Sequence, residues 1–290
     1  MGLKTVGLLS PGDMGHVVGK VLKQNGLQVL TCLEGRSDRT RRLAEISGVE
    51  AVSSYDQLVK DVSLIISILV PAEAKNVAQS VGLAIKDTGE KIVYADCNAI
   101  SPETSKQIDV VISEVGSKFV DAGIIGGPPR QKGITRFYCS GPDTSTFEEL
   151  GNYGLDVRVA GREIGQASGL KMCYAASTKG YTALCTELLI AAKKMGLYER
   201  LVEEFQLSQE VRYRSMESGL PGMPTKARRW IGEMEEIAKT FEDLGLTPKI
   251  YQGAADVFRM VGETSLAEET PETQDKSRTL AQMIKLLTKS

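Results

Sequence analysis

The stretch TVGLLSPGDMG, residues 5–15, decides the fold of the first part of the chain. Its apolar start is typical of a buried strand, and a helix-length segment follows from Met14 to Gln24. Between them lies the pattern G-x-G-x-x-G, with serine in the first glycine position. The middle glycine gives a pyrophosphate close access to the backbone, and the last lets the helix pack near the strand. The pattern predicts a dinucleotide-binding unit in preference to an ordinary βα turn. The residues predicted to contact this cofactor are Ser10, Pro11, Gly12, Asp13, Met14 and Gly15.

The same alternation of strand and helix continues over the first 160 residues. Helix-length segments such as Arg39–Ser47 separate β-rich runs, which predicts βαβ units and a parallel sheet covered on both faces. The expected strands are Thr5–Leu9, Gln28–Leu33, Leu64–Val70, Lys91–Asp96, Lys118–Ala122 and Arg136–Ser140.

Beyond residue 160 the strand signals stop and helices are expected to the end of the chain. The first of these is about 30 residues long without proline, and breaker-rich loops separate the others. We therefore expect an α/β fold: a doubly wound parallel sheet (1–162), then an all-α domain (163–290) built on a long interdomain helix. The expected helices are Gln166–Met195, Glu199–Glu217, Lys226–Leu244, Lys249–Val261 and Glu272–Leu287.

Composition excludes several kinds of chemistry. The 290 residues carry a net charge of −2, which gives no reason to expect nucleic acid or a membrane as partner. His16 is the only histidine, and the five cysteines form no C-x-x-C pair, so neither a histidine triad nor a metal site is expected. His16 itself is expected on a helix face or beside the cofactor. The scattered cysteines are typical of reduced thiols, and no signal peptide is seen, so we expect a cytoplasmic protein.

The end of the second expected strand bears on the choice of dinucleotide. Glu34 lies 19 residues after Gly15, near the usual place for an acid that holds the ribose 2′-hydroxyl of NAD. Arg36 and Ser37 follow at once, and such residues suit the 2′-phosphate of NADP. The alternative is that Ser37 only caps the next helix. NADP is therefore predicted as the cofactor, with NAD as the alternative.

Five segments together resemble the β-hydroxyacid dehydrogenases, which include 3-hydroxyisobutyrate, tartronate semialdehyde and 6-phosphogluconate dehydrogenases. SPGDMG (10–15) resembles the G-L-G-x-M-G start of that family, and LVP (69–71) its cofactor-contacting segment. DCNAISP (96–102) is similar to D-x-S-T-x-x-P, DAGIIGG (121–127) to D-A-P-V-S-G-G, and GQASGLK (165–171) to G-x-G-x-x-x-K. ARRWIGEM (227–234) resembles a phosphogluconate-dehydrogenase-like branch. The resemblance implies a Rossmann-type first domain.

The resemblance also implies roles for single residues. Lys171 matches the lysine that acts as general acid–base on the carbonyl oxygen, and its place near a helix start suits proton exchange near neutral pH. Two asparagines of the family are replaced by Tyr174 and Ala175, and Ile125 replaces a serine. We expect Tyr174 and Thr178, on the helix face of Lys171, either to supply polar contacts or to pack between domains. The further implied contacts are Leu69, Val70, Pro71 and Asn98 for the cofactor, and Asn98, Gly126 and Gly127 for the substrate.

The resulting expectation is an NADP-dependent oxidoreductase that interconverts an alcohol, such as a hydroxy acid, and its carbonyl. Imine or ketone reduction, decarboxylation of a sugar acid, and dinucleotide binding without catalysis stay as alternatives. The long helix and the resemblance together predict a homodimer.

Overall fold

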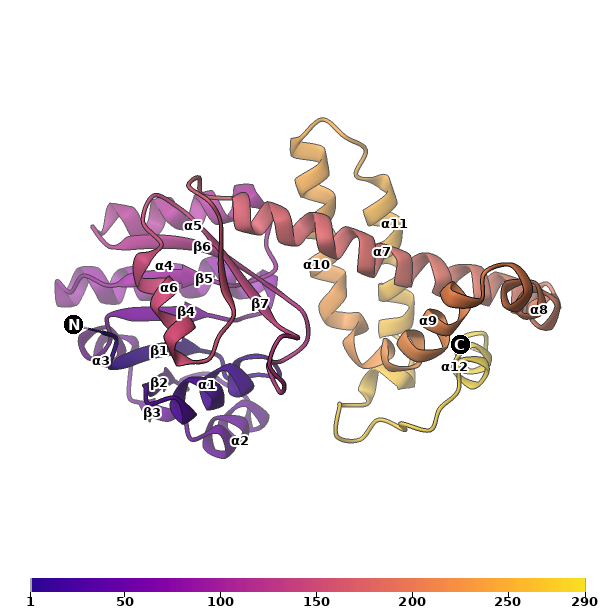
Figure 1. Cartoon of the computed structure of the whole chain (residues 1–290), viewed down its shortest axis with the longest axis horizontal. Coiled ribbons are helices and arrows are strands. Elements are labelled where there is room, and N and C mark those ends of the chain that lie inside the picture. The colour runs from indigo at the N-terminus through magenta and orange to yellow at the C-terminus, as the bar shows by residue number, and fades with distance from the viewer. Residues whose placement is uncertain (1, 290) are drawn as a thin grey trace. The chain divides into compact units, whose positions relative to one another are not determined.

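The computed structural model describes residues 2–289, which form two compact units, one up to Met172 and one from Cys173 onward. The expected fold class is confirmed: over residues 2–289, the first unit holds one mixed sheet and the second holds helices without strands (Figure 1). The expected boundary fell before the long helix. The units instead divide inside that helix, because its first turns pack on the sheet. No helix within residues 2–289 is long and apolar enough to cross a membrane.

The sheet has eight strands in the order β3-β2-β1-β4-β5-β6-β7-β8. The order of the strands reverses between β1 and β4, and ligands of doubly wound sheets bind beside such a reversal, at the carboxyl ends of the strands. The strands are β1 (Thr5–Leu9), β2 (Gln28–Cys32), β3 (Glu50–Val52), β4 (Leu64–Ser67), β5 (Val93–Asp96), β6 (Lys118–Ile125), β7 (Arg136–Ser140) and β8 (Val157–Gly161).

The structure corrects three expectations about the sheet. β3 and β8 were missed, because both are edge strands with exposed residues and so lack an apolar pattern. β7 pairs antiparallel with β6, because the turn between them returns directly without a crossover helix. The expected strand Leu64–Val70 ends at Ser67, since the short helix at Pro71–Glu73 begins soon after it.

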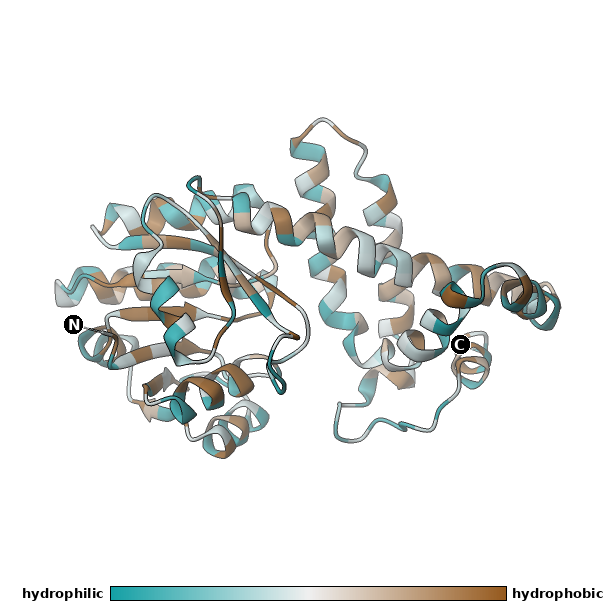
Figure 2. Cartoon of the chain, in the orientation of Figure 1, coloured by the Kyte–Doolittle hydropathy of each residue, from teal (hydrophilic) through white to brown (hydrophobic). Residues whose placement is uncertain are grey.

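Helices cover both faces of the sheet. One apolar cluster contains Val18 and Leu22 of α1, and the other contains Val81 and Ile85 of α4. Figure 2 shows largely hydrophobic strands between helices of alternating character, as expected for a sheet buried on both sides. The helices of this unit are α1 (Gly15–Gln24), α2 (Asp38–Ser47), α3 (Tyr55–Asp61), α4 (Ala74–Thr88), α5 (Pro102–Glu114), α6 (Ser145–Glu148) and the start of α7 (Gln166–Lys194).

In the described residues, the second unit contains the rest of α7, five further α-helices and three short 3-10 helices. Lys179 of α7 forms a 2.8 Å ion pair with Glu233 of α10, and the Lys179 ammonium lies 5.6 Å from the ring centre of Trp230. Both charged side chains of this pair are largely buried, so it fixes α7 against α10. The helices are α8 (Tyr198–Ser208), α9 (Glu210–Gly219), α10 (Ala227–Asp243), α11 (Lys249–Gly262) and α12 (Leu280–Leu287).

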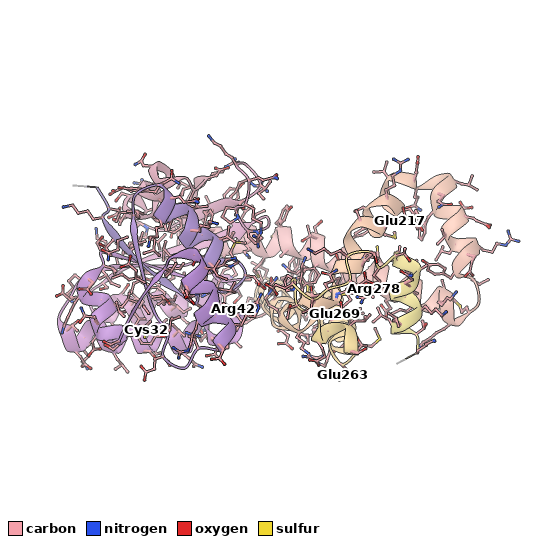
Figure 3. The ribbon with its side chains drawn as sticks, turned by 90° about the horizontal axis from the view of Figure 1, so that it is seen from below. Cys32, Arg42, Glu217, Glu263, Glu269 and Arg278 are labelled. Carbon is pink, nitrogen blue, oxygen red and sulfur yellow. The ribbon has the colours of Figure 1, made fainter. Side chains whose placement is uncertain are left out.

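Two helix expectations for this unit were wrong in part. The segment expected as Glu199–Glu217 is two helices, divided at Gln209, where the backbone leaves the helical conformation. The last helix begins at Leu280, because Thr279 and Gln282 form a capping box there. The residues before it form a loop in which Arg278 is paired with Glu269 (Figure 3).

Candidate active site

The turn after β1 has the shape that a pyrophosphate requires. Ser10 has a positive φ of 60°, a conformation that glycine adopts more easily, and its carbonyl accepts a 2.7 Å bond from the Gly12 N–H. A Cβ on Gly15 would lie 2.5 Å from the Ser10 oxygen, so only glycine fits there. A Cβ on Gly12 would meet nothing nearer than that oxygen, at 4.0 Å. Gly12 therefore leaves open, beside the N-terminus of α1, the space that a bound phosphate needs.

His16 and Asp13 brace this turn. His16 Nδ1 lies 2.6 Å from the Gly12 carbonyl oxygen, so that nitrogen carries the proton and donates it. Asp13 forms a 2.5 Å ion pair with Arg39 of α2. The pair with Arg39 joins the phosphate turn to the helix after β2.

The segment after β2 contains the residues that the sequence suggested for the choice between NAD and NADP. Ser37 caps α2 by accepting a 3.3 Å bond from the Thr40 N–H, as the capping alternative stated. Arg36 is half-buried, and its Nε has no hydrogen-bond partner among residues 2–289. Glu34 is exposed. A guanidinium suits a phosphate because it is always charged and offers several donors in one plane.

Asn98 belongs to a buried polar network at the carboxyl ends of β4 and β5. Its Oδ1 accepts a 2.5 Å bond from the Leu69 N–H, and its Nδ2 donates to Ser67 (3.1 Å) and Asp96 (2.8 Å). Its amide protons are therefore both engaged, and the side chain fixes the loop Leu69–Val70–Pro71. Ser67 and Asp96 were not singled out from the sequence. Only the pairing of β4 with β5 brings them together.

Lys171 lies on the first turns of α7 against β6. Its Nζ donates a 2.6 Å bond to the Ile124 carbonyl oxygen, and its side chain is half-buried. A Cβ on Gly123 would lie 3.0 Å from the Lys171 Cβ, so the helix approaches the strand at a glycine. The ammonium group is therefore held two residues before the Gly126-Gly127 pair.

Asp121 lies on β6 three residues before Ile124, and the sequence pointed to it only as part of a motif. It is fully buried and accepts bonds from Ser105 (2.8 Å), Ser140 (2.9 Å), Gly165 N–H (3.0 Å) and Ser168 N–H (3.0 Å), as well as from the Ser168 hydroxyl. This carboxylate sits at the N-terminus of the helix that carries Lys171.

The remaining expected substrate residues lie in two places. Gly126 and Gly127 follow β6, where Gly126 has a φ of 112° and the Gly127 carbonyl accepts a bond from Thr135. Tyr174 and Thr178 are exposed on the part of α7 beyond Met172. The first unit thus brings the glycine pair and Lys171 together, whereas Tyr174 and Thr178 belong to the second.

A cysteine nucleophile at this site is disfavoured. Cys97 lies near Lys171 and is fully buried, and burial together with the charge of Asp96 raises the pKa of its thiol well above the usual value. A neutral, buried thiol is a poor nucleophile.

Comparison with known proteins agrees with this geometry. Residues 5–153 match the NAD binding domain of 6-phosphogluconate dehydrogenase, and residues 192–261 match a domain of unknown function, DUF1932. An uncharacterized 28.5 kDa protein of Methanothermus fervidus is 30% identical over 259 residues, which cover 89% of this chain and 99% of that one.

Two solved structures show the same fold. The conserved protein MTH1747, of unknown function and described as structurally similar to 3-hydroxyacid dehydrogenases, is 32% identical with a TM-score of 0.66, over 89% of this chain and 97% of that one. Mycobacterium tuberculosis 3-hydroxyisobutyrate dehydrogenase, solved with L-serine, is 17% identical with a TM-score of 0.67, over 90% and 94%.

The fold and the site define a dinucleotide-binding protein with the architecture of the hydroxyacid dehydrogenases. The chain belongs to the family of the NAD binding domain of 6-phosphogluconate dehydrogenase, and it carries a DUF1932 segment after that domain. The resemblance stated from the motifs is thereby confirmed.

Proposed function

We propose that the protein is an NADP-dependent oxidoreductase that interconverts an alcohol, such as a hydroxy acid, and its carbonyl compound, with Lys171 as the general acid–base. The observation that carries the proposal is the Lys171 ammonium, fixed at 2.6 Å on the Ile124 carbonyl oxygen. This bond orients the ammonium group, and an ammonium can donate a proton to a substrate oxygen. A bound nicotinamide supplies or accepts the hydride.

In the reducing direction Lys171 gives a proton to the carbonyl oxygen as the carbonyl carbon receives the hydride, which yields the alcohol. The neutral amine then regains a proton from water. In the oxidising direction the amine takes the hydroxyl proton. The loop Leu69–Val70–Pro71, fixed by Asn98, would support the nicotinamide end of the cofactor, while the turn at Gly12 and Gly15 would hold its pyrophosphate.

The test of this function is a panel of small hydroxy acids, ketones, aldehydes, cyclic imines and 6-phosphogluconate, with nicotinamide absorbance as the readout. Turnover of an alcohol–carbonyl pair supports the proposal. Turnover of imines alone would assign C=N reduction instead, and release of carbon dioxide would assign decarboxylation. Cofactor binding without any turnover would favour a non-catalytic dinucleotide-binding protein.

The choice of NADP is tested at Arg36. Arg36→Ala is expected to raise the KM for NADPH by roughly 10- to 100-fold, because a hydrogen bond to a charged group contributes about 1.5–3 kcal/mol. The KM for NADH should stay nearly constant, since NADH has no 2′-phosphate. Arg42→Ala, an exposed arginine of α2 labelled in Figure 3, is the matched control. Equal effects of Arg36→Ala on the two cofactors would contradict the NADP assignment.

We also propose that the protein is a homodimer held together by the end of α7 and α8. A hollow of about 450 Å³ lies between these helices and is lined by apolar side chains such as Leu188, Ala192 and Leu201. Met195 and Leu197 also line it and are 65% and 50% exposed. A face that carries both a hollow and projecting apolar side chains can pair with its own copy across a two-fold axis.

Light scattering at micromolar concentration is expected to give the dimer mass. Leu197→Glu should shift the protein to monomer, because it places a charge in the apolar contact while suiting the start of α8. Leu246→Glu replaces a leucine of similar exposure (55%) elsewhere in the second unit and should leave the dimer intact. A wild-type monomer would refute this part of the proposal.

A further inference from the structure

We propose that Asp121 is a positioning residue for Lys171: it caps α7 from the neighbouring strand and thereby holds the lysine on the Ile124 carbonyl. The inference concerns the lysine to which the proposed function assigns proton transfer, and in that respect it rests on that function. Asp121 acts through the helix and is not itself placed on a reacting atom.

The first turn of α7 takes its caps from distant parts of the chain. The Gly165 and Ser168 N–H groups both donate to Asp121 Oδ2 at 3.0 Å, and the Ala167 N–H donates to Ser140 Oγ at 2.9 Å. These are donors that the beginning of a helix leaves without intrahelical partners. Asp121 and Ser140 face each other in the antiparallel pairing of β6 with β7. One strand pair therefore fixes where α7 begins.

The position of the lysine follows from that start. Lys171 is three residues after Ser168, on the next turn of the same helix, and the strand that carries Asp121 also supplies the Ile124 carbonyl. Cap and acceptor thus belong to the same rigid strand. Gly123 lies between Asp121 and Ile124 on β6. A Cβ on Gly123 would be 3.0 Å from the Lys171 Cβ, so α7 packs closely on the strand at this glycine. Loss of the cap would free the lysine from its acceptor.

The hydrogen-bond donors around Asp121 distinguish two kinds of substitution. Oδ2 receives two backbone N–H groups, which can only donate, and the Ser140 hydroxyl. Oδ1 receives two serine hydroxyls, which can rotate and accept. An asparagine can therefore place its oxygen at Oδ2 and its amino group at Oδ1. Asp121→Asn should preserve the cap, and Asp121→Ala should abolish it.

Two serines that donate to this carboxylate provide a matched pair. Ser140 bonds both Asp121 and the Ala167 N–H, so it belongs to the cap. Ser105 of α5 bonds Asp121 from another side and contacts the carboxylate only at Oδ1. Both are fully buried serines, and only Ser140 is joined directly to α7.

The test measures the lysine directly and needs no substrate. The full chain is treated with acetic anhydride at one pH, and mass spectrometry gives the acetylation rate of Lys171 relative to exposed Lys118. Asp121→Ala and Ser140→Ala are expected to speed labelling of Lys171 on the order of tenfold, since loss of a helix cap shifts local opening by that order. Asp121→Asn and Ser105→Ala should stay within about twofold of wild type.

Amide hydrogen exchange over residues 166–172 should be faster in Asp121→Ala and Ser140→Ala, and near the wild-type rate in Asp121→Asn and Ser105→Ala. If exchange rises in Asp121→Ala and Ser140→Ala while Lys171 labelling does not, Asp121 merely stabilises the helix and the proposal falls. Equal labelling rates of Lys171 in Ser140→Ala and Ser105→Ala would also overturn the proposal. If Asp121→Ala does not fold, this comparison of the two serine variants is the deciding test.

Turnover separates this inference from the proposed function. With any panel compound that the wild-type protein reduces, Asp121→Ala should lower kcat by about 100-fold and leave the cofactor Kd unchanged. This is the effect expected when a catalytic group is displaced by about 1 Å. In a protein that already carries Lys171→Ala, adding Asp121→Ala should not lower the residual kcat further. If the protein reduces no compound of the panel but the acetylation rates of Lys171 change as expected, the proposed function is refuted and the positioning role of Asp121 stands.

Discussion

Lys171→Ala is expected to lower kcat by about 10²–10⁴-fold, the usual contribution of a general acid–base, while the Kd for NADPH stays within about twofold. The lysine bonds the Ile124 carbonyl on β6 and belongs neither to the phosphate turn nor to the segment after β2. Calorimetric titration measures the Kd for NADPH, and steady-state kinetics with a panel compound that the wild-type protein reduces measures kcat.

The control for that variant is Lys118→Ala, which removes a lysine from the surface of the same unit. Lys118 forms a 2.7 Å ion pair with Asp143, and both side chains are well exposed. Such a pair contributes about 0–1 kcal/mol, so turnover should be unchanged. Full activity of Lys171→Ala would show that another group transfers the proton.

Gly12→Ala and Gly15→Ala are expected to weaken cofactor binding for two different reasons. At Gly15 the added Cβ would lie 2.5 Å from the Ser10 carbonyl oxygen, so the turn itself must shift. That crowding should cost about 1–3 kcal/mol of folding free energy and lower the Tm by several degrees. At Gly12 the nearest protein atom would be 4.0 Å away, so the folded protein accepts the methyl group.

Gly12→Ala should therefore keep the wild-type Tm and weaken NADPH binding at least about tenfold, or about 1.4 kcal/mol, because the methyl group occupies the space of the pyrophosphate. Calorimetric binding and thermal unfolding of both variants give the comparison. Gly127→Ala is a suitable control for the stability measurement, since a Cβ there has no neighbour within 4 Å. Tight binding by Gly12→Ala would place the pyrophosphate elsewhere.

Much of the fold follows from local pattern. The strand–turn–helix at residues 5–24 was predicted nearly residue for residue, because a buried strand and an amphipathic helix leave distinct periodicities. The edge strands β3 and β8 were missed because exposed residues carry no such signal. The direction of β7 was also missed, since it depends on which strand the chain reaches after its turn at Gly126.

In the candidate site, too, some residues were predicted from the sequence, whereas the contacts that hold them were not. Lys171 and the glycines of the phosphate turn were identified by motif, because their roles require particular residue types at fixed spacing. The bonds that hold Asn98 and Asp121 were not predicted. The acceptor of Ser168 lies 47 residues away in the chain, and the donor to Asn98 Oδ1 lies 29 residues away.

By itself, the sequence determined a dinucleotide-binding sheet followed by helices, and a lysine near the start of the long helix. Short-range chemistry suffices for both, since turns and helix faces are set within a few residues. Only the tertiary structure decided what holds that lysine. Its helix is capped by Asp121 and Ser140, which face each other because two strands pair antiparallel, and strand register is a long-range property.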